Sequence, residues 1–138
     1  MITIGHMHTY LVRLESGSWP LIACWLLGLY LILGSAYTAW TLHSNWSTLT
    51  DMGVIETMGG PALMALPWLL RLTTGICFLI RSKWLLLAMP LWIGAFAWQI
   101  VRMNTWDTLP SDFFLALGIQ ACMACFAIWL HAGAHLKR

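Results

Sequence analysis

The sequence predicts an all-α integral membrane protein, a single transmembrane domain over residues 1–138 built as a four-helix bundle. Hydrophobic residues make up 60% of the chain and charged residues only 9%, whereas soluble domains carry roughly a quarter charged residues. The ten tryptophans fit this class because tryptophan is enriched where the bilayer meets water. The lipid bilayer is therefore the expected partner. A net charge of +2 without a basic stripe excludes nucleic acid.

Four apolar stretches are long enough to cross a bilayer as helices, at about 19–42, 62–80, 84–101 and 113–130. A hydrocarbon core of roughly 30 Å needs about 20 helical residues, and only a helix satisfies its own backbone hydrogen bonds in lipid. The first stretch is longer than a signal-peptide core and has no small-residue cleavage site behind it, so we expect it to be retained. Small residues should let the helices approach closely, namely Gly28, Gly34, Ser35, Gly75, Gly94 and Gly118.

The connectors between these helices differ in charge, and this difference predicts the orientation. Basic residues flank the termini and the tight second connector: Arg13, Arg81, Lys83, Lys137 and Arg138. The first and third connectors carry acids and tryptophans instead: Trp46, Asp51, Glu56, Trp106, Asp107 and Asp112. Basic residues near short loops stay in the cytoplasm. We therefore expect both termini inside, a short cytoplasmic turn, and two acidic, Trp-rich periplasmic loops in a bacterial inner-membrane protein.

Arg71 indicates a functional position, because it lies near the middle of the second predicted helix. An arginine at that depth is costly and usually faces protein or a cavity. It could make a structural contact with a helix or a partner subunit, serve a quinone or substrate, or extend to the membrane surface. The groups predicted to pair with it are Asp51, Glu56, Gln99 and backbone carbonyls freed by Pro67 or Pro90.

Further polar and aromatic side chains are predicted near the outer ends of the helices: His43, Trp46, Gln99, Arg102, Trp106 and Asp107. If they converge at one depth, they form a rim of hydrogen-bonding groups above an apolar slot, which a quinone head group requires. Together with Arg71 they are the predicted quinone-binding residues. The alternative is an ordinary belt of interfacial residues.

The cysteines are expected to be small buried hydrophobic residues. Cys122 and Cys125 form a CxxC motif, but it lies inside the fourth predicted helix, where hydrocarbon disfavours a thiolate. Cys24 and Cys77 are interpreted in the same way. The run His6-Met7-His8 has side chains that suit copper, yet chance explains three such residues better. We predict no metal site and no catalytic residue.

Three motifs occur together: Gly28-Leu-Tyr-Leu-Ile-Leu-Gly34, Ile80-Arg-Ser-Lys83, and Trp106-Asp-Thr-Leu-Pro-Ser-Asp112 followed by Gly118-Ile119. As a set they resemble the membrane-anchor region of PQQ-dependent quinoprotein dehydrogenases. In that family apolar helices hold a periplasmic β-propeller that oxidises sugars or polyols and passes electrons to ubiquinone. The resemblance implies a non-catalytic anchor subunit in a hetero-oligomer, with PQQ only in the dehydrogenase partner. It also implies ubiquinone as the ligand nearest this chain, and no covalently bound cofactor.

Trp68-Leu-Leu-Arg-Leu72 resembles a second family, the small four-helix DoxX-like membrane proteins. That resemblance implies a membrane redox or assembly subunit of a respiratory complex. A third interpretation comes from the residues themselves. In a small transporter or channel subunit, Arg71 and the proline-containing helices would line a path for an anion or a metal.

Overall fold

The structure, a computed structural model, describes residues 18–103 and 111–136. Within these ranges it is all-helical and has no strand. Its four long helices are α2 (Trp19–Ser44), α5 (Pro61–Ile80), α6 (Leu85–Met103) and α7 (Ser111–Ala132), each apolar and long enough to span a membrane. Every end lies within about two residues of its predicted position. The prediction of an all-α, four-helix membrane protein is therefore confirmed.

The helices begin and end where local backbone chemistry requires it. Pro61 is the first residue of α5, a position where the missing N–H has no helical partner to lose. Gly60 precedes it with φ of 103°, a left-handed conformation that favours glycine. At the other end Arg81 adopts a left-handed conformation with φ of 53°, and Ser82 N–H donates to Cys77 O at 3.0 Å. This cap turns the chain directly into α6.

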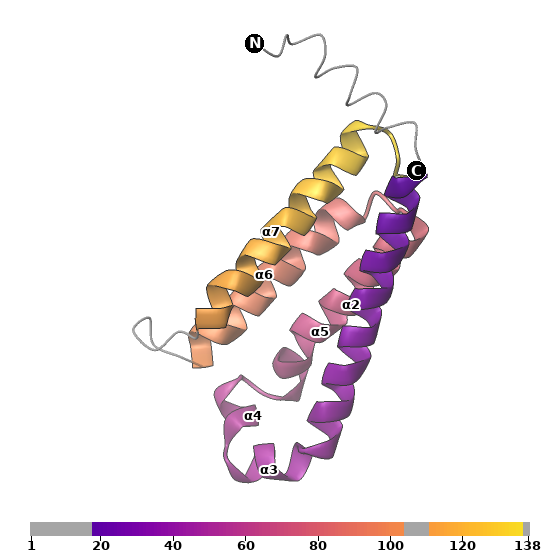
Figure 1. Cartoon of the computed structure of the whole chain (residues 1–138). Coiled ribbons are helices and arrows are strands. Elements are labelled where there is room, and N and C mark those ends of the chain that lie inside the picture. Colours follow the sequence, from indigo (N-terminus) through magenta and orange to yellow (C-terminus); the bar gives the residue numbers. More distant parts are fainter. Residues whose placement is uncertain (1–17, 104–110, 137–138) are drawn as a thin grey trace.

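The long helices alternate in direction, so that three features share one end of the bundle: the start of α2, the Arg81–Lys83 turn and the end of α7 (Figure 1). We call this the turn end. At the opposite end, the cap end, the connector between α2 and α5 contains two short helices, α3 (Trp46–Asp51) and α4 (Val54–Thr57). The placement of the turn end in the cytoplasm stays a prediction from charge.

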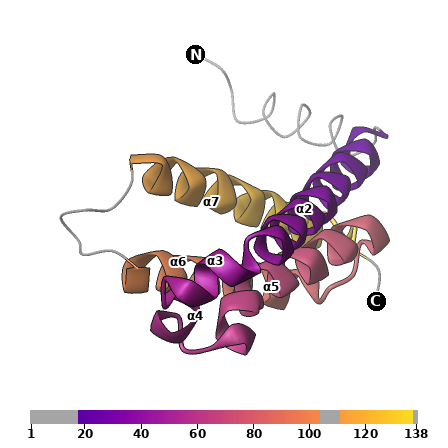
Figure 2. The ribbon, with the colours of Figure 1, turned by 90° about the horizontal axis from the view of Figure 1, so that it is seen from below.

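The helices follow one another in space as they do in sequence, with main contacts of α2 with α5, α5 with α6, and α6 with α7. From the turn end to the cap end α2 and α7 spread apart, as the two views together show (Figures 1 and 2). They meet at the turn end, where the Trp19 and Trp129 rings stack with centroids 5.1 Å apart. The bundle is thus closed at the turn end and open on one side toward the cap end.

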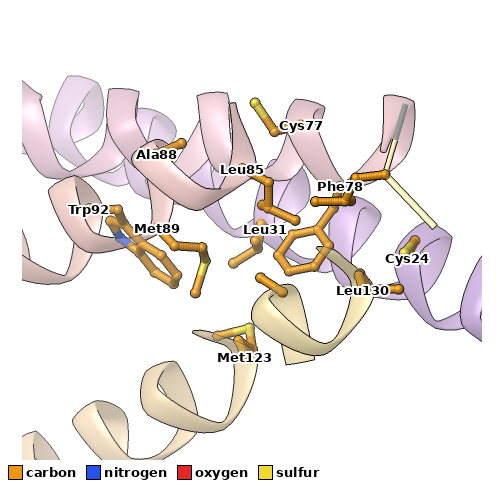
Figure 3. Packing of buried hydrophobic residues seen from close by; sticks show 12 residues of the cluster. Cys24, Leu31, Cys77, Phe78, Leu85, Ala88, Met89, Trp92, Met123 and Leu130 are labelled. Atoms are coloured by element: carbon orange, nitrogen blue, oxygen red, sulfur yellow. The ribbon is translucent and has the colours of Figure 1, made fainter. Parts of the chain in front are cut away.

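The main hydrophobic core lies in the closed half. Figure 3 shows side chains of all four long helices turned toward one another there. Phe78, Leu85, Leu31 and Leu130 are each fully buried. A smaller cluster at the cap end joins Ile55 and Met58 to α5, together with Leu42 and Leu49. Between these two clusters the described part of the chain has less packed side-chain volume.

Glycines explain why α2 and α5 approach closely. A Cβ on Gly28 would lie 2.9 Å from the Gly75 carbonyl oxygen, and one on Gly75 would lie 3.0 Å from the Gly28 carbonyl oxygen. The expected role of these two glycines is therefore confirmed. For Gly94 and Gly118 it is wrong, because a Cβ on either would meet nothing within 4 Å. Both lie on helix faces that no neighbouring helix covers.

The cysteine prediction is correct for two residues and wrong for two. Cys24 and Cys77 are buried, whereas Cys122 and Cys125 are exposed. The physical reason is that α7 packs mainly against α6, so another face of α7 is left for lipid. In residues 18–103 and 111–136 no three His, Cys, Asp or Glu side chains gather to hold a metal. The His6-Met7-His8 run lies outside the described residues.

Candidate functional site

A cavity of about 310 Å³ lies between the four long helices, and we call it the central cavity. Its walls come from every long helix, including Tyr30, Thr38, Trp68, Arg71, Trp92, Phe96, Gln99, Gln120 and Met123. Ligand pockets for small molecules begin at about 300 Å³ and combine apolar walls with a few polar groups. The volume therefore fits the head group of an amphiphile or another compact molecule.

Arg71 reaches this cavity from the middle of α5. Its guanidinium lies against Gly34 of α2, where any Cβ would collide with it. The guanidinium carbon also lies 5.4 Å from the centroid of the Tyr30 ring, a cation–π contact. The missing side chain at Gly34 thus creates the slot that holds the arginine.

Arg71 has no hydrogen-bonding or ionic partner in residues 18–103 and 111–136, and its buried Nε is unpaired. Of the partners expected for it, neither Asp51 nor Glu56 pairs with it in these ranges. Gln99 lines the same cavity, but its Nε2 donates to the Met64 carbonyl oxygen at 3.5 Å. A buried Nε without a partner is costly at this depth, which makes the surroundings of Arg71 the first place to look for a ligand.

Two more buried polar atoms are unpaired within the described residues and belong to side chains that line the central cavity: Nε1 of Trp68 and Oε1 of Gln120. A fourth such atom, Nε2 of His135, belongs to a residue beyond the end of α7, at the turn end. Leaving a buried donor or acceptor unpaired costs about 1–3 kcal/mol. Three of these atoms belong to side chains that line the central cavity, which makes this cavity the candidate binding site.

The chemistry of these groups constrains that ligand. Arginine and the tryptophan indole are donors only, whereas the glutamine amide offers both an acceptor and a donor. Arg71 and Trp68 lie on α5, and Gln120 lies on α7. The cavity therefore suits a molecule that accepts hydrogen bonds on the α5 side and accepts or donates on the α7 side.

The other predicted site residues do not converge here. His43 and Trp46 line a separate outer cavity of about 300 Å³ at the cap end, between α2, α3 and α5. The two cavities share Leu42, Met64 and Trp68 as a common wall. Of the proposed set, the structure brings together Arg71 and Gln99 in one cavity and His43 and Trp46 in the other.

Arg102 has a structural role that the prediction missed. Its Nε donates to the Thr57 carbonyl oxygen at 2.9 Å, and its guanidinium lies over the Trp98 ring at 5.3 Å from the centroid. It therefore fastens α4 to α6, and it does not line the central cavity. Trp106 and Asp107 lie outside the described residues.

Gln120, Trp68 and Tyr30 were not predicted as site residues. Gln120 could have been identified from the sequence, because it is the only amide side chain in the apolar stretch 113–130. It is only 5% exposed. Trp68 and Tyr30 could not have been identified in this way. Aromatic residues occur throughout these helices, and helix packing decides whether such a side chain faces lipid or the cavity.

Comparisons of the chain with protein-family models, with curated proteins and with solved structures gave no match. The resemblances to quinoprotein anchors and to DoxX-like proteins therefore stay predictions. The central cavity is therefore the candidate functional site of this protein.

Proposed function

We propose that this chain is a non-catalytic membrane subunit that binds a quinone head group in the central cavity and serves a quinone-dependent dehydrogenase. The observation that carries the proposal is that three side chains lining this cavity, those of Trp68, Arg71 and Gln120, each have a buried polar atom without a partner in the described residues. A quinone is a flat apolar ring with carbonyl oxygens on opposite sides. Its carbonyl oxygens accept from the donors of Trp68 and Arg71, whereas Oε1 of Gln120, an acceptor, is paired only by a hydroxyl of the quinol form.

The same groups suit both redox forms of such a ligand. Arg71 and Trp68 donate to one oxygen of the quinone, and the Gln120 amide donates to the other. After reduction to the quinol, the second oxygen carries a hydrogen, and Gln120 accepts it through Oε1. Trp92 and Phe96 of α6 provide apolar contact for the ring.

The electrons come from a partner, in this proposal a periplasmic dehydrogenase that holds PQQ and docks at the cap end of the inner-membrane subunit. This part rests on the resemblance of Ile80-Arg-Ser-Lys83 and the accompanying motifs to quinoprotein anchors. The cap end supplies the docking surface, because α3 and α4 cover it and Arg102 fixes α4 in place. This chain orients the quinone, and the partner oxidises the substrate and donates the electrons.

The binding step is tested with the purified chain in lipid nanodiscs and decylubiquinone as the probe. Quinones quench tryptophan fluorescence, and two tryptophans line the cavity, so titration gives an affinity. Arg71→Gln should weaken binding roughly 10- to 100-fold, the loss expected for a charge-assisted hydrogen bond of about 1.5–3 kcal/mol. Arg102→Gln is the matched control and should leave the affinity unchanged. Absence of saturable binding to the unaltered chain would overturn the proposal.

The partnership is tested separately by mild-detergent purification of the tagged chain from its native membranes. Mass spectrometry identifies the associated proteins, and a dye-reduction assay with sugars and polyols reports dehydrogenase activity. Co-purification of an active quinoprotein dehydrogenase supports the docking role. Recovery of the chain alone, or of unrelated respiratory subunits without this activity, refutes it and favours an assembly subunit.

One observation favours a second candidate, a small transporter or channel subunit for an anion. The Arg71 guanidinium has no counter-charge in the described residues, and a passing anion would supply one. Flux of chloride, phosphate or acetate into proteoliposomes distinguishes the candidates. Flux that Arg71→Gln abolishes supports the transporter, whereas quinone binding without anion flux supports the subunit.

A further inference from the structure

A second hollow, which we call the α7 groove, lies beside the central cavity; it is shallow and largely open, and the space over it measures about 580 Å³. Leu27 of α2 forms one edge, and the rest is formed by α7, including Gly118, Ile119, Cys122, Met123 and Phe126. Apart from the weakly polar thiol of Cys122, its side chains are apolar. A ligand in this groove would gain contacts but no strong hydrogen bond from these side chains.

The groove and the central cavity are continuous along α7, because Ile119 and Met123 line both. The groove is lined by Leu27 of α2 and by residues of α7, the two helices that spread apart toward the cap end (Figures 1 and 2). A molecule bound in the central cavity can therefore extend into the groove without crossing a packed helix contact.

The sizes of the two spaces divide an amphiphile into two parts. About 310 Å³ in the central cavity accommodates a substituted ring, but not a long apolar chain as well. Gly118 borders open space in the groove, since a Cβ there would meet nothing within 4 Å. The polar atoms that need a ligand lie in the cavity, and the apolar space lies in the groove.

We propose that the α7 groove holds the flexible apolar chain of the ligand whose head group occupies the central cavity. The ligand class is therefore a quinone with a prenyl or alkyl chain, rather than a tailless quinone. This inference rests on the proposed quinone-binding function and adds a second subsite to it. Because lipid is as apolar as the groove, the chain gains packing contacts rather than hydrophobic free energy.

The test fills the groove with a side chain from this protein. Gly118→Leu places an isobutyl group in the groove, and Gly94→Leu places the same group on α6, where a Cβ also meets nothing within 4 Å. Both variants are compared with the unaltered chain in nanodiscs. The probes are 2,3-dimethoxy-5-methyl-1,4-benzoquinone and its 6-decyl derivative. Circular dichroism and melting temperature must match those of the unaltered chain in both variants.

We expect Gly118→Leu to weaken binding of the decyl compound about tenfold, as overpacking a filled apolar site does. It should leave the tailless compound unchanged, and Gly94→Leu should affect neither compound. Since each variant is compared with the same probe, differences in partitioning of the two probes into lipid cancel.

The outcomes separate the two proposals. If neither compound binds the unaltered chain, the proposed function fails. If both bind but Gly118→Leu weakens neither, the function stands and the groove proposal is overturned. If Gly118→Leu instead releases a co-purifying partner protein while binding of both quinones is kept, the groove holds a partner helix and the proposal is likewise overturned.

Discussion

Replacing Gly34 with alanine would place a methyl group where the guanidinium of Arg71 lies. A Cβ at this position would be 3.0 Å from Nη1 and closer still to Cζ and Nη2. Carbon and nitrogen atoms without a hydrogen bond between them need roughly 3.5 Å. The guanidinium must therefore move by the order of 1 Å, and its position between α2 and the cavity is lost.

The size of the effect follows from which contact is lost. The clash falls on the far end of a flexible side chain rather than on backbone, so the fold can accommodate it at a cost of about 1 kcal/mol or less. The N–H groups of the displaced guanidinium no longer point at the ligand oxygen. A charge-assisted hydrogen bond that is misaligned loses most of its roughly 1.5–3 kcal/mol. Decylubiquinone binding should weaken roughly tenfold or more.

Tryptophan-fluorescence titration in nanodiscs measures this change, with Gly94→Ala as the matched control because a Cβ there meets nothing within 4 Å. Melting temperature checks that Gly34→Ala is folded. An unchanged affinity in Gly34→Ala, together with a large loss in Arg71→Gln, would refute the argument that Gly34 positions the guanidinium. It would mean that the arginine serves the ligand from several positions.

Three further substitutions probe the fold rather than the ligand. Gly75→Ala should destabilise the α2–α5 contact by about 1–3 kcal/mol, seen as a lower denaturant midpoint, since its Cβ would lie 3.0 Å from the Gly28 carbonyl oxygen. Phe78→Ala, at 0% exposure, should cost about 1–3 kcal/mol in the same assay, less than in soluble cores because lipid removes the hydrophobic driving force. Arg102→Ala should speed hydrogen exchange in residues 54–59 without changing quinone affinity, since it removes the bond to Thr57.

The sequence was sufficient to predict the helices because the bilayer fixes their length and nearly every residue of each span is apolar. Because the spans are apolar on every side, the sequence could not predict which helix faces pack against one another. A helix such as α7 is apolar on all faces, so its pattern does not indicate which face turns inward. For this reason Cys122, Cys125 and Gly118 were placed against neighbouring helices, although in the structure they lie toward open space.

The candidate site could be predicted only where one residue was chemically unusual for its depth. Arg71 was found because an arginine in the middle of a span is costly, and Gln120 could have been found by a weaker form of the same argument. The partners of such residues depend on how helices rotate about their axes. His43 and Trp46 line the outer cavity at the cap end, beyond the level of Gly34 and Arg71, and Arg102 donates to the α4 backbone.

Because α7 diverges from α2 away from the turn end, a small tilt of α7 about its contacts at the turn end displaces its cap-end residues the most. Its 22 residues span about 33 Å at 1.5 Å per residue. A tilt of about 5° about the aromatic contacts near Trp129 thus moves the far end of α7 by about 3 Å. Transmembrane helices tilt to match the thickness of the surrounding hydrocarbon. A change in bilayer thickness that tilted α7 in this way would therefore change its separation from α2 toward the cap end.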